Sequence, residues 1–336
     1  FVKSYVEDNS QKDLIIIPHG ELWNLNFDLL LTEETTSNNP KDFPYLLKDY
    51  NISYANSATL LFQDSFKEKQ RTAGNCLAFS YSDSLSLVND SESSFMSFNT
   101  LRKAGDDLPG SRREIAAVAK IIDGNYYFGK EASEKNFKEQ AEKYNILHLA
   151  LHGEIDNQDP NNSKLYFTAS KDSIEDDFLY THELYAMDLP SELTVLSACN
   201  TGAGKLAKGE GIMSLGRAFQ YAGTKSLMLS SWEVSDGVAP ELMKAFYSYL
   251  KDGKSKSESL RLAKLGYLQN APAERSYPYY WGNFFILGDD SSVSLEREKP
   301  FTIYLIFGVL IIFFMSGVYY ARRKILLKAN SRFVEN

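Results

Sequence analysis

The sequence predicts an α/β fold in which helices cover both faces of a mostly parallel sheet. Short apolar runs alternate along the chain with segments that repeat apolar residues every three or four positions, which is the order expected of strand–helix–strand units. Two of the runs, at 146–151 and 193–199, are apolar almost throughout, as strands buried on both faces of a parallel sheet are. No sequence repeat of about 20–50 residues is present, which argues against a solenoid.

The elements in the first half of the chain follow from start and stop signals. A capping box of Ser111 and Glu114 opens a helical pattern, and Ser133 precedes a second one. A long surface loop is predicted before the first of these helices, because the stretch that precedes it is rich in Ser, Asp, Asn and Gly. We therefore expect strands over 14–18, 76–80 and 126–128, helices over 111–122 and 133–143, and the loop over 82–109.

In the second half, apolar strand-like runs are followed by glycine-rich or polar turns. The helical segments between them carry apolar residues on one face, as Ile212, Leu215 and Phe219 do. Residues 281–287 are either a closing strand or a packed turn. We expect strands over 146–151, 164–169, 193–199 and 226–232, helices over 212–221, 239–250 and 255–268, and a glycine-rich loop over 202–211.

The composition is that of a globular protein with few groups available for chemistry. The 336 residues are 43% hydrophobic, and their net charge of −8 argues against a nucleic-acid partner. The two cysteines, Cys76 and Cys199, lie far apart, so we expect neither a disulfide framework nor a metal knuckle. No cofactor is expected, because the phosphate-loop-like run at 202–205 is followed by Leu206 in place of Ser or Thr.

Residues 301–320 predict a membrane-spanning helix. They carry no charge, and at 1.5 Å rise per residue they extend about 30 Å, the thickness of a bilayer core; a buried core helix is the alternative. Basic residues are more frequent after this segment than before it, so the positive-inside rule places the C-terminal tail in the cytoplasm. The side of the membrane on which the rest of the chain lies stays open. The chain starts at Phe1 without a visible signal peptide, as a piece of a longer protein would.

His152 and Cys199 are the candidate catalytic residues, because each comes at the end of a predicted strand. The carboxyl ends of neighbouring parallel strands meet at one sheet edge, where sites in such sheets form. A cysteine there supplies a thiolate nucleophile, and a histidine can hold its proton and return it to a leaving amine. The backbone N–H groups of Gly153 and Cys199 could form an oxyanion hole. A buried core cysteine and a turn histidine are the plain alternatives for the two residues taken singly.

His148 is the rival base, and we interpret it as a core histidine with its hydrogen bonds satisfied, four residues inside the sheet. A zinc pair of His148 and His152 on a helix is disfavoured, because the run lacks the glutamate of the zinc motif and Gly153 ends it. We therefore expect no metal. His182 resembles a residue at the start of a helix, and His19 lies in a predicted turn.

Linked motifs along the chain resemble those of one known family: IPHGEL at 17–22, LPGSRRE at 108–114, ILHLALHG at 146–153, LTVLSACNTG at 193–202, SWEVSD at 231–236 and YYWGNF at 279–284. Together, over about residues 10–290, they are similar to the CHAT domain, the caspase-like peptidase domain found with tetratricopeptide repeats. The resemblance implies a caspase–haemoglobinase fold and a His/Cys dyad, at the positions of His152 and Cys199. It also implies that Asp236 receives a basic side chain, as the matching acidic residue does in separase.

Two points limit what the resemblance implies. Ser197 and Ala198 precede the cysteine where caspases have Gln-Ala, so a preference for aspartate in the substrate is not implied. Asp236 has an alternative role as the N-cap of the helix expected over 239–250.

We therefore expect a CHAT peptidase domain over 1–290, a juxtamembrane linker over 291–300, the transmembrane helix over 301–320 and a basic tail over 321–336. The expected function is that of a membrane-anchored cysteine endopeptidase that cleaves protein substrates after a basic residue. The expected regulator is an upstream tetratricopeptide repeat region with its activating partner. The alternatives are a non-catalytic scaffold that binds partner proteins and, more weakly, a cysteine acyltransferase or hydrolase of small molecules.

Overall fold

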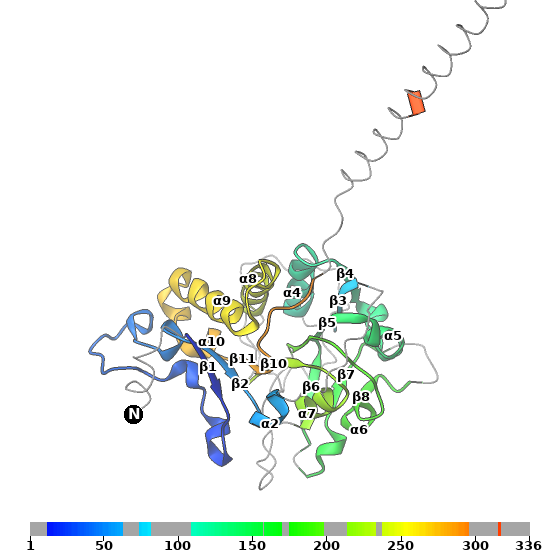
Figure 1. The fold of residues 1–336 in the computed structure, drawn as a ribbon, viewed down its shortest axis with the longest axis horizontal. Coiled ribbons are helices and arrows are strands. Elements are labelled where there is room, and N and C mark those ends of the chain that lie inside the picture. Colours follow the sequence, from blue (N-terminus) through cyan, green and yellow to red (C-terminus); the bar gives the residue numbers. More distant parts are fainter. Residues whose placement is uncertain are drawn as a thin grey trace, which may run out of the picture. The chain divides into compact units, whose positions relative to one another are not determined.

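An eight-stranded sheet forms the centre of the molecule, in the order β1-β2-β11-β10-β9-β5-β3-β4 (Figure 1). The computed structural model describes residues 12–62, 74–81, 109–156, 158–169, 175–197, 214–232, 237–295 and 315–316. The strands from β10 to β4 in this order are parallel to one another. Strand β11 is antiparallel to β10 and parallel to β2, which in turn is parallel to β1. The sheet is therefore mostly parallel, as predicted.

The bounds of the elements are as follows. The strands of the large sheet are β1 Asp13–Ile16, β2 Asn51–Tyr54, β3 Gly74–Ser80, β4 Gly124–Phe128, β5 Tyr144–Ala150, β9 Leu193–Leu196, β10 Ser226–Ser230 and β11 Phe284–Gly288. A second, antiparallel sheet consists of β6 His152–Glu154, β7 Lys164–Tyr166 and β8 Phe178–Tyr180. The α-helices are α2 Ala58–Phe62, α4 Pro109–Ala119, α5 Glu134–Gln140, α6 Thr181–Leu184, α7 Ser214–Tyr221, α8 Ala239–Lys251, α9 Lys256–Asn270 and α10 Pro278–Trp281. The 3₁₀ turns are η1 Gly20–Asn24, η2 Phe27–Leu29, η3 Pro40–Asp42, η4 Leu46–Lys48, η5 Gly129–Glu131, η6 Ala141–Lys143, η7 Pro160–Asn162 and η8 Ala273–Arg275.

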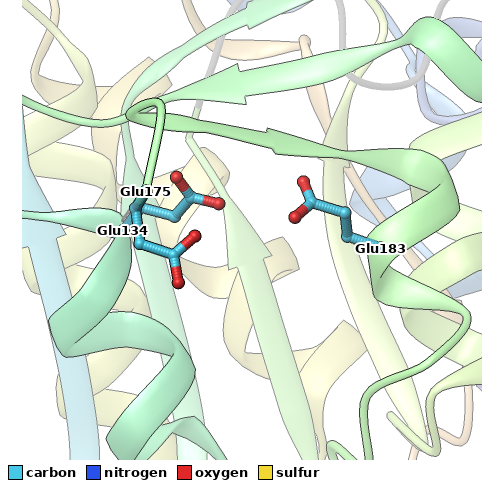
Figure 2. A group of neighbouring side chains, drawn as sticks. All are labelled: Glu134, Glu175 and Glu183. Atoms are coloured by element: carbon cyan, nitrogen blue, oxygen red, sulfur yellow. The ribbon is translucent and has the colours of Figure 1, made fainter. Parts of the chain in front are cut away.

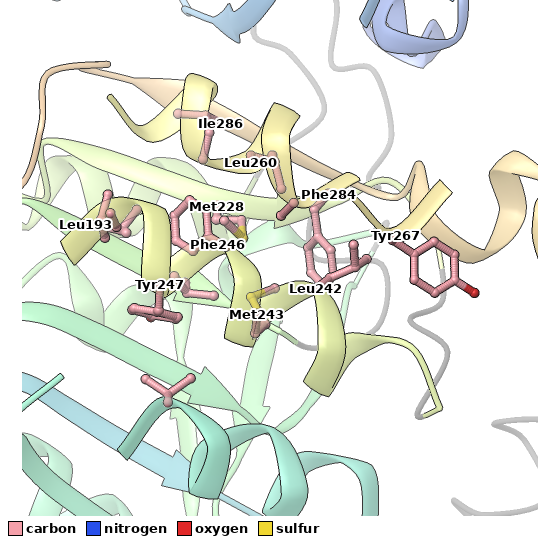
Figure 3. Packing of buried hydrophobic residues seen from close by; sticks show 14 of the residues in the cluster. Leu193, Met228, Leu242, Met243, Phe246, Tyr247, Leu260, Tyr267, Phe284 and Ile286 are labelled. Carbon is pink, nitrogen blue, oxygen red and sulfur yellow. The ribbon is translucent and has the colours of Figure 1, made fainter. Parts of the chain in front are cut away.

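Alternation along the central strands divides the core into two layers, one on each face of the large sheet. Leu147 and Leu149 of β5 face the layer that contains α5, α6, α7 and the second sheet. Ile146 and Ala150 face the opposite layer, built from α4, α8 and α9. Figure 3 shows residues of α8 and α9 packed over β9, β10 and β11 in this second layer. Burying each such Leu or Phe side chain stabilises the fold by about 1.5–3 kcal/mol.

Most predicted elements are present, with ends that differ by a few residues. The closing segment at 281–287 contains a strand, β11, and the run at 164–169 is shortened to β7. The capping box of Ser111 and Glu114 is wrong, because α4 already begins at Pro109 and the Glu114 carboxylate contacts His148 instead. The loop expected over 82–109 lies, except for Pro109, outside the described residues, as does the glycine-rich loop over 202–211.

The expectation of a single-pass membrane protein is contradicted. In the part of the chain that the structure describes, no helix has both the length and the apolar character needed to cross a bilayer. Of the segment 301–320, only Met315 and Ser316 belong to that part. Residues 296–336 form a unit apart from residues 1–295, and everything that follows concerns the first unit.

Candidate active site

His152 lies where the large sheet passes into the small one. Strand β5 ends at Ala150, Leu151 makes a buried bend, and His152 opens β6. In the antiparallel register of the small sheet, His152 stands opposite Tyr166, and Tyr166 stands opposite Phe178. The histidine therefore begins a row of side chains on one face of this sheet.

The two faces of the small sheet differ in burial. Leu165 and Leu179 point from one face into the core and are fully buried. Gly153 is opposite Leu165 and belongs to this inward row, so the histidine side chain before it belongs to the half-buried outer face. Sequence reasoning placed His152 at a strand end but missed the strand that follows it, because three residues are too few for a periodicity signal.

The outer face also holds a cation among aromatic rings, which sequence reasoning missed. The Lys164 ammonium lies 4.9 Å from the ring centroid of Phe178 and 5.3 Å from those of Tyr166 and Tyr180. It is 3.9 Å from the Glu154 carboxylate, and the Tyr166 hydroxyl donates a hydrogen bond to the same carboxylate. The alternation in KLY and FLY was the available signal, since it places Lys164, Tyr166, Phe178 and Tyr180 on one face. These groups hold the outer face beside His152 in a fixed arrangement.

Tyr81 contacts His152 from the end of the neighbouring strand β3. The two ring centroids are 4.5 Å apart and the ring planes meet at 76°, which is a T-shaped contact. The Tyr81 N–H donates to the carbonyl oxygen of Ala150 at 3.2 Å, so the strand pairing of β3 with β5 fixes its backbone. Burial, and after it the charge of Asp177, raise the pKa of Tyr81 above its usual value, so its phenol is neutral at pH 7.

The strand that leads to Cys199 is the immediate neighbour of the strand that leads to His152. Strands β5 and β9 are parallel, and Leu149 pairs with Leu196 at their carboxyl ends. Ser197 follows β9 and is the last described residue before Cys199, which itself lies outside the described residues. The strand adjacency on which the predicted pair depends is therefore present. The geometry of the pair and the oxyanion role of Gly153 remain predictions.

Asp236 also lies outside the described residues, so both of its predicted roles remain predictions. Helix α8 begins at Ala239, and its N-cap residue is Val238. On the other side of Asp236, the Trp232 indole donates a hydrogen bond to the carbonyl oxygen of Tyr279 at 2.9 Å.

Of the histidines and cysteines outside the predicted pair, His148 and Cys76 belong to the core. His148 is fully buried, with Nδ1 2.8 Å from the Tyr247 hydroxyl and Nε2 2.8 Å from Glu114 Oε1, which confirms it as a core histidine. His182 lies at the start of α6, as predicted. Cys76 is fully buried in β3, and burial raises the pKa of its thiol to about 12. An uncharged, enclosed thiol of this kind is inert.

Three glutamates form a cluster that resembles a metal site, at Glu134 of α5, Glu175 and Glu183 of α6. Figure 2 shows their carboxylates turned toward one another from three separate segments. One oxygen of each carboxylate lies within 4.8 Å of those of the other two. The Lys138 ammonium lies 2.7 Å from all three carboxylates and so takes the place that a cation would occupy. Among the described residues no other such group occurs. We interpret the cluster as an ionic clamp between α5, the segment before β8 and α6.

The clamp shifts the titration of its members. Burial raises the pKa of Glu134 to about 7, against the opposing effect of Lys138. Burial alone would lower the pKa of Lys138, but hydrogen bonds to the three carboxylates raise it overall.

Comparison with curated proteins gives two relatives whose shared name refers to tetratricopeptide repeats. Tetratricopeptide repeat protein 28 of Homo sapiens is 32% identical over 104 residues, and its Mus musculus counterpart is 32% identical over 108 residues. The aligned parts are 31% and 32% of this chain but only 4% of each relative. This chain therefore spans a small fraction of the relatives it matches.

Comparison with solved structures gives distant likenesses. The Saccharomyces cerevisiae separase–securin complex has a TM-score of 0.46 at 12% identity, over 74% of this chain and 15% of that chain. The complex of the pro- and mature domains of RgpB from Porphyromonas gingivalis has a TM-score of 0.49 at 8% identity, over 87% and 67%. The Arg-specific cysteine proteinase gingipain R has a TM-score of 0.44 at 8% identity, over 79% and 60%.

The family assignment rests on the sequence. The family model of the CHAT domain matches residues 2–289, which include every strand and helix of the first unit that the structure describes. The chain belongs to the CHAT domain family.

Proposed function

We propose that this CHAT domain is a cysteine endopeptidase in which His152 and Cys199 form the catalytic pair. The observation that carries the proposal is the parallel pairing of β5 with β9. His152 follows β5 and Cys199 follows β9 in the sequence, and the carboxyl ends of parallel neighbours lie at the same edge of the sheet. The half-buried position of His152 agrees with this, since the imidazole is reachable from solvent and held by neighbouring strands.

The proposed reaction proceeds through an acyl-enzyme. The Cys199 thiolate attacks the carbonyl carbon of the scissile peptide bond, and the oxygen of that carbonyl takes the negative charge. Collapse of this intermediate breaks the C–N bond while His152 gives its proton to the leaving nitrogen. A water molecule then attacks the thioester, His152 accepts the water proton, and the acid product leaves as the thiolate reforms. The Gly153 N–H is proposed to stabilise the oxyanion in both steps.

Specificity for a basic residue is proposed to depend on Asp236. This proposal comes from the similarity of the segment Ser231–Asp236 to the separase pattern, in which an acidic residue follows a tryptophan. A carboxylate pairs with a guanidinium through two charge-assisted hydrogen bonds, which would favour Arg before the scissile bond.

The regulator is proposed to be a tetratricopeptide repeat region in the same protein. The support is the family, together with the names of the relatives, Tetratricopeptide repeat protein 28 in both Homo sapiens and Mus musculus. Protein substrates are proposed on the same basis, since a peptidase held by a repeat region would act on polypeptides that the region selects.

A thiol-reactive peptide probe with Arg at its recognition position tests the proposal. We expect the probe to label wild-type protein at one site, to label Cys76→Ala equally, and to leave Cys199→Ala unlabelled. A probe with Asp at the same position is the matched control. Equal labelling of Cys199→Ala and wild type would exclude the proposed nucleophile, and a folded protein that no probe labels would favour the non-catalytic scaffold.

A further inference from the structure

Tyr81 is the aromatic residue that touches the His152 ring, and its backbone is fixed independently of that contact. It follows β3 directly, and Ser80 before it pairs with Ala150 at the end of β5. Its N–H bonds to the Ala150 carbonyl oxygen at 3.2 Å. Two adjacent strands therefore deliver the two rings to the same place, with 4.5 Å between their centroids.

The contact with Tyr81 restricts the rotation of the His152 imidazole, which remains half-buried. A T-shaped pair sets the edge of one ring against the face of the other, so rotation of either ring breaks the contact. His152 is itself half-buried, and its opposite strand neighbour is Tyr166. An imidazole held against the Tyr81 ring has fewer orientations available than a free one, and a proton-transferring group at the end of a strand requires a fixed orientation.

We propose that Tyr81 is a positioning residue for His152 and that its ring keeps the imidazole turned toward the Cys199 end of β9. The inference rests on the proposed His152–Cys199 pair. The role belongs to the ring and requires no proton transfer by the phenol hydroxyl. In this account a thiolate forms at Cys199 near neutral pH because a correctly oriented His152 accepts the thiol proton.

Other charged groups near this site could also affect its titration. The Glu154 carboxylate lies two residues further along β6, where the Tyr166 hydroxyl and the Lys164 ammonium face it. Burial, and after it the charge of Asp177, raise the pKa of the Tyr81 phenol. None of these four groups is removed when Tyr81 is substituted, and Tyr81→Phe keeps the ring while it removes the hydroxyl, so the variants test the ring separately from the charges.

The test uses the rate at which a small uncharged alkylating agent, iodoacetamide, modifies the protein as a function of pH. The chain has two cysteines, and Cys76 is fully buried, so the rate in folded protein reports Cys199. We expect Tyr81→Leu and Tyr81→Met to lower the rate at pH 7 by about tenfold and to move the pH of half-maximal rate toward that of a lone thiol, about 8.5. Tyr81→Phe should keep the wild-type profile, because it keeps the ring.

Tyr127→Leu is the matched control, since this residue of β4 also makes a close ring contact, stacked on Phe79 at 5.2 Å, but does not touch His152. It should keep the wild-type profile, and thermal unfolding should show that all the variants are folded. A wild-type profile for both Tyr81→Leu and Tyr81→Met, with an altered one for His152→Ala, would overturn the role of Tyr81 and leave the catalytic pair standing. A profile that His152→Ala does not alter would exclude the pair itself, and the role of Tyr81 with it. Equal loss in Tyr81→Phe and Tyr81→Leu would assign the effect to the hydroxyl and overturn the inference.

Discussion

His148 Nε2 lies 2.8 Å from Glu114 Oε1, and both side chains are buried between the sheet and α4. The pair joins a strand of the large sheet to the helix that covers it, and Tyr247 of α8 completes it at Nδ1. Such a buried polar connection stabilises the fold only while all its members are present.

Removing one member of this pair should therefore destabilise the protein strongly. We expect Glu114→Ala to lower the free energy of unfolding by about 1–3 kcal/mol, because it leaves His148 Nε2 buried without a hydrogen-bond partner. Replacing both residues by apolar ones, Glu114→Leu with His148→Leu, should cost less than the single change. Urea denaturation of Glu114→Leu, His148→Leu and the double variant measures the coupling, and simple additivity of the two single changes would contradict it.

The ionic clamp predicts a pH dependence of stability. The pKa of Glu134 is about 7 in the folded protein, above the ordinary value of 4.5, so the folded state holds this proton more tightly than the unfolded state does. Stability should then fall as the pH rises from about 5 to about 7, by roughly 1–3 kcal/mol in total.

The matched variant is Glu134→Gln, which has no carboxylate to titrate. It should be more stable than wild type at pH 7.5 and should lack this component of the pH dependence, as measured by thermal or urea unfolding at each pH. Identical slopes in wild type and Glu134→Gln between pH 5 and 7 would show that Glu134 does not titrate there.

Cys76 should not react with thiol reagents in the native protein. Its thiol is fully buried and its pKa is about 12, so a thiol reagent should count one cysteine before unfolding and two afterwards. Cys76→Ala should leave Cys199 reactivity unchanged and should cost about 1 kcal/mol of stability, as small core truncations do. Two rapidly reacting thiols in folded protein would contradict this placement.

Asp236→Ala should change substrate preference more than the chemistry. Leaving a substrate Arg without its carboxylate partner costs about 3–5 kcal/mol, or roughly 10²–10³ or more in kcat/KM for Arg substrates. Alkylation of Cys199 by a small uncharged reagent should persist, because the thiolate is untouched. Cleavage of matched Arg, Lys, Asp and Met peptides by wild type and Asp236→Ala measures the preference. A wild-type preference for Asp would remove Asp236 from the site.

The sequence predicted the parts of the fold that local patterns encode. The apolar runs at 146–151 and 193–199 gave β5 and β9, because strands buried on both faces leave an almost continuous apolar signal. His148 could be assigned to the core for the same reason. The capping box of Ser111 and Glu114 failed because a long-range contact with His148 used the carboxylate that the local pattern assigned to the helix end.

The parts that sequence could not predict depend on register between distant segments. Tyr81 and His152 are 71 positions apart, and only the pairing of β3 with β5 brings their rings together. The clamp around Lys138 joins α5, the segment before β8 and α6, and no spacing rule predicts such a meeting. The expectation of membrane anchoring came from the hydropathy of a single segment, and the described helices contradict it.

Cleavage of a peptide library by the full-length protein, together with the proposed repeat region and activating partner, tests the catalytic pair most directly. The account predicts that Cys199→Ala and His152→Ala each reduce kcat/KM to background while remaining folded, and that the double variant is no worse than either single one, because the two residues act as a unit. Retained cleavage by Cys199→Ala would contradict the account.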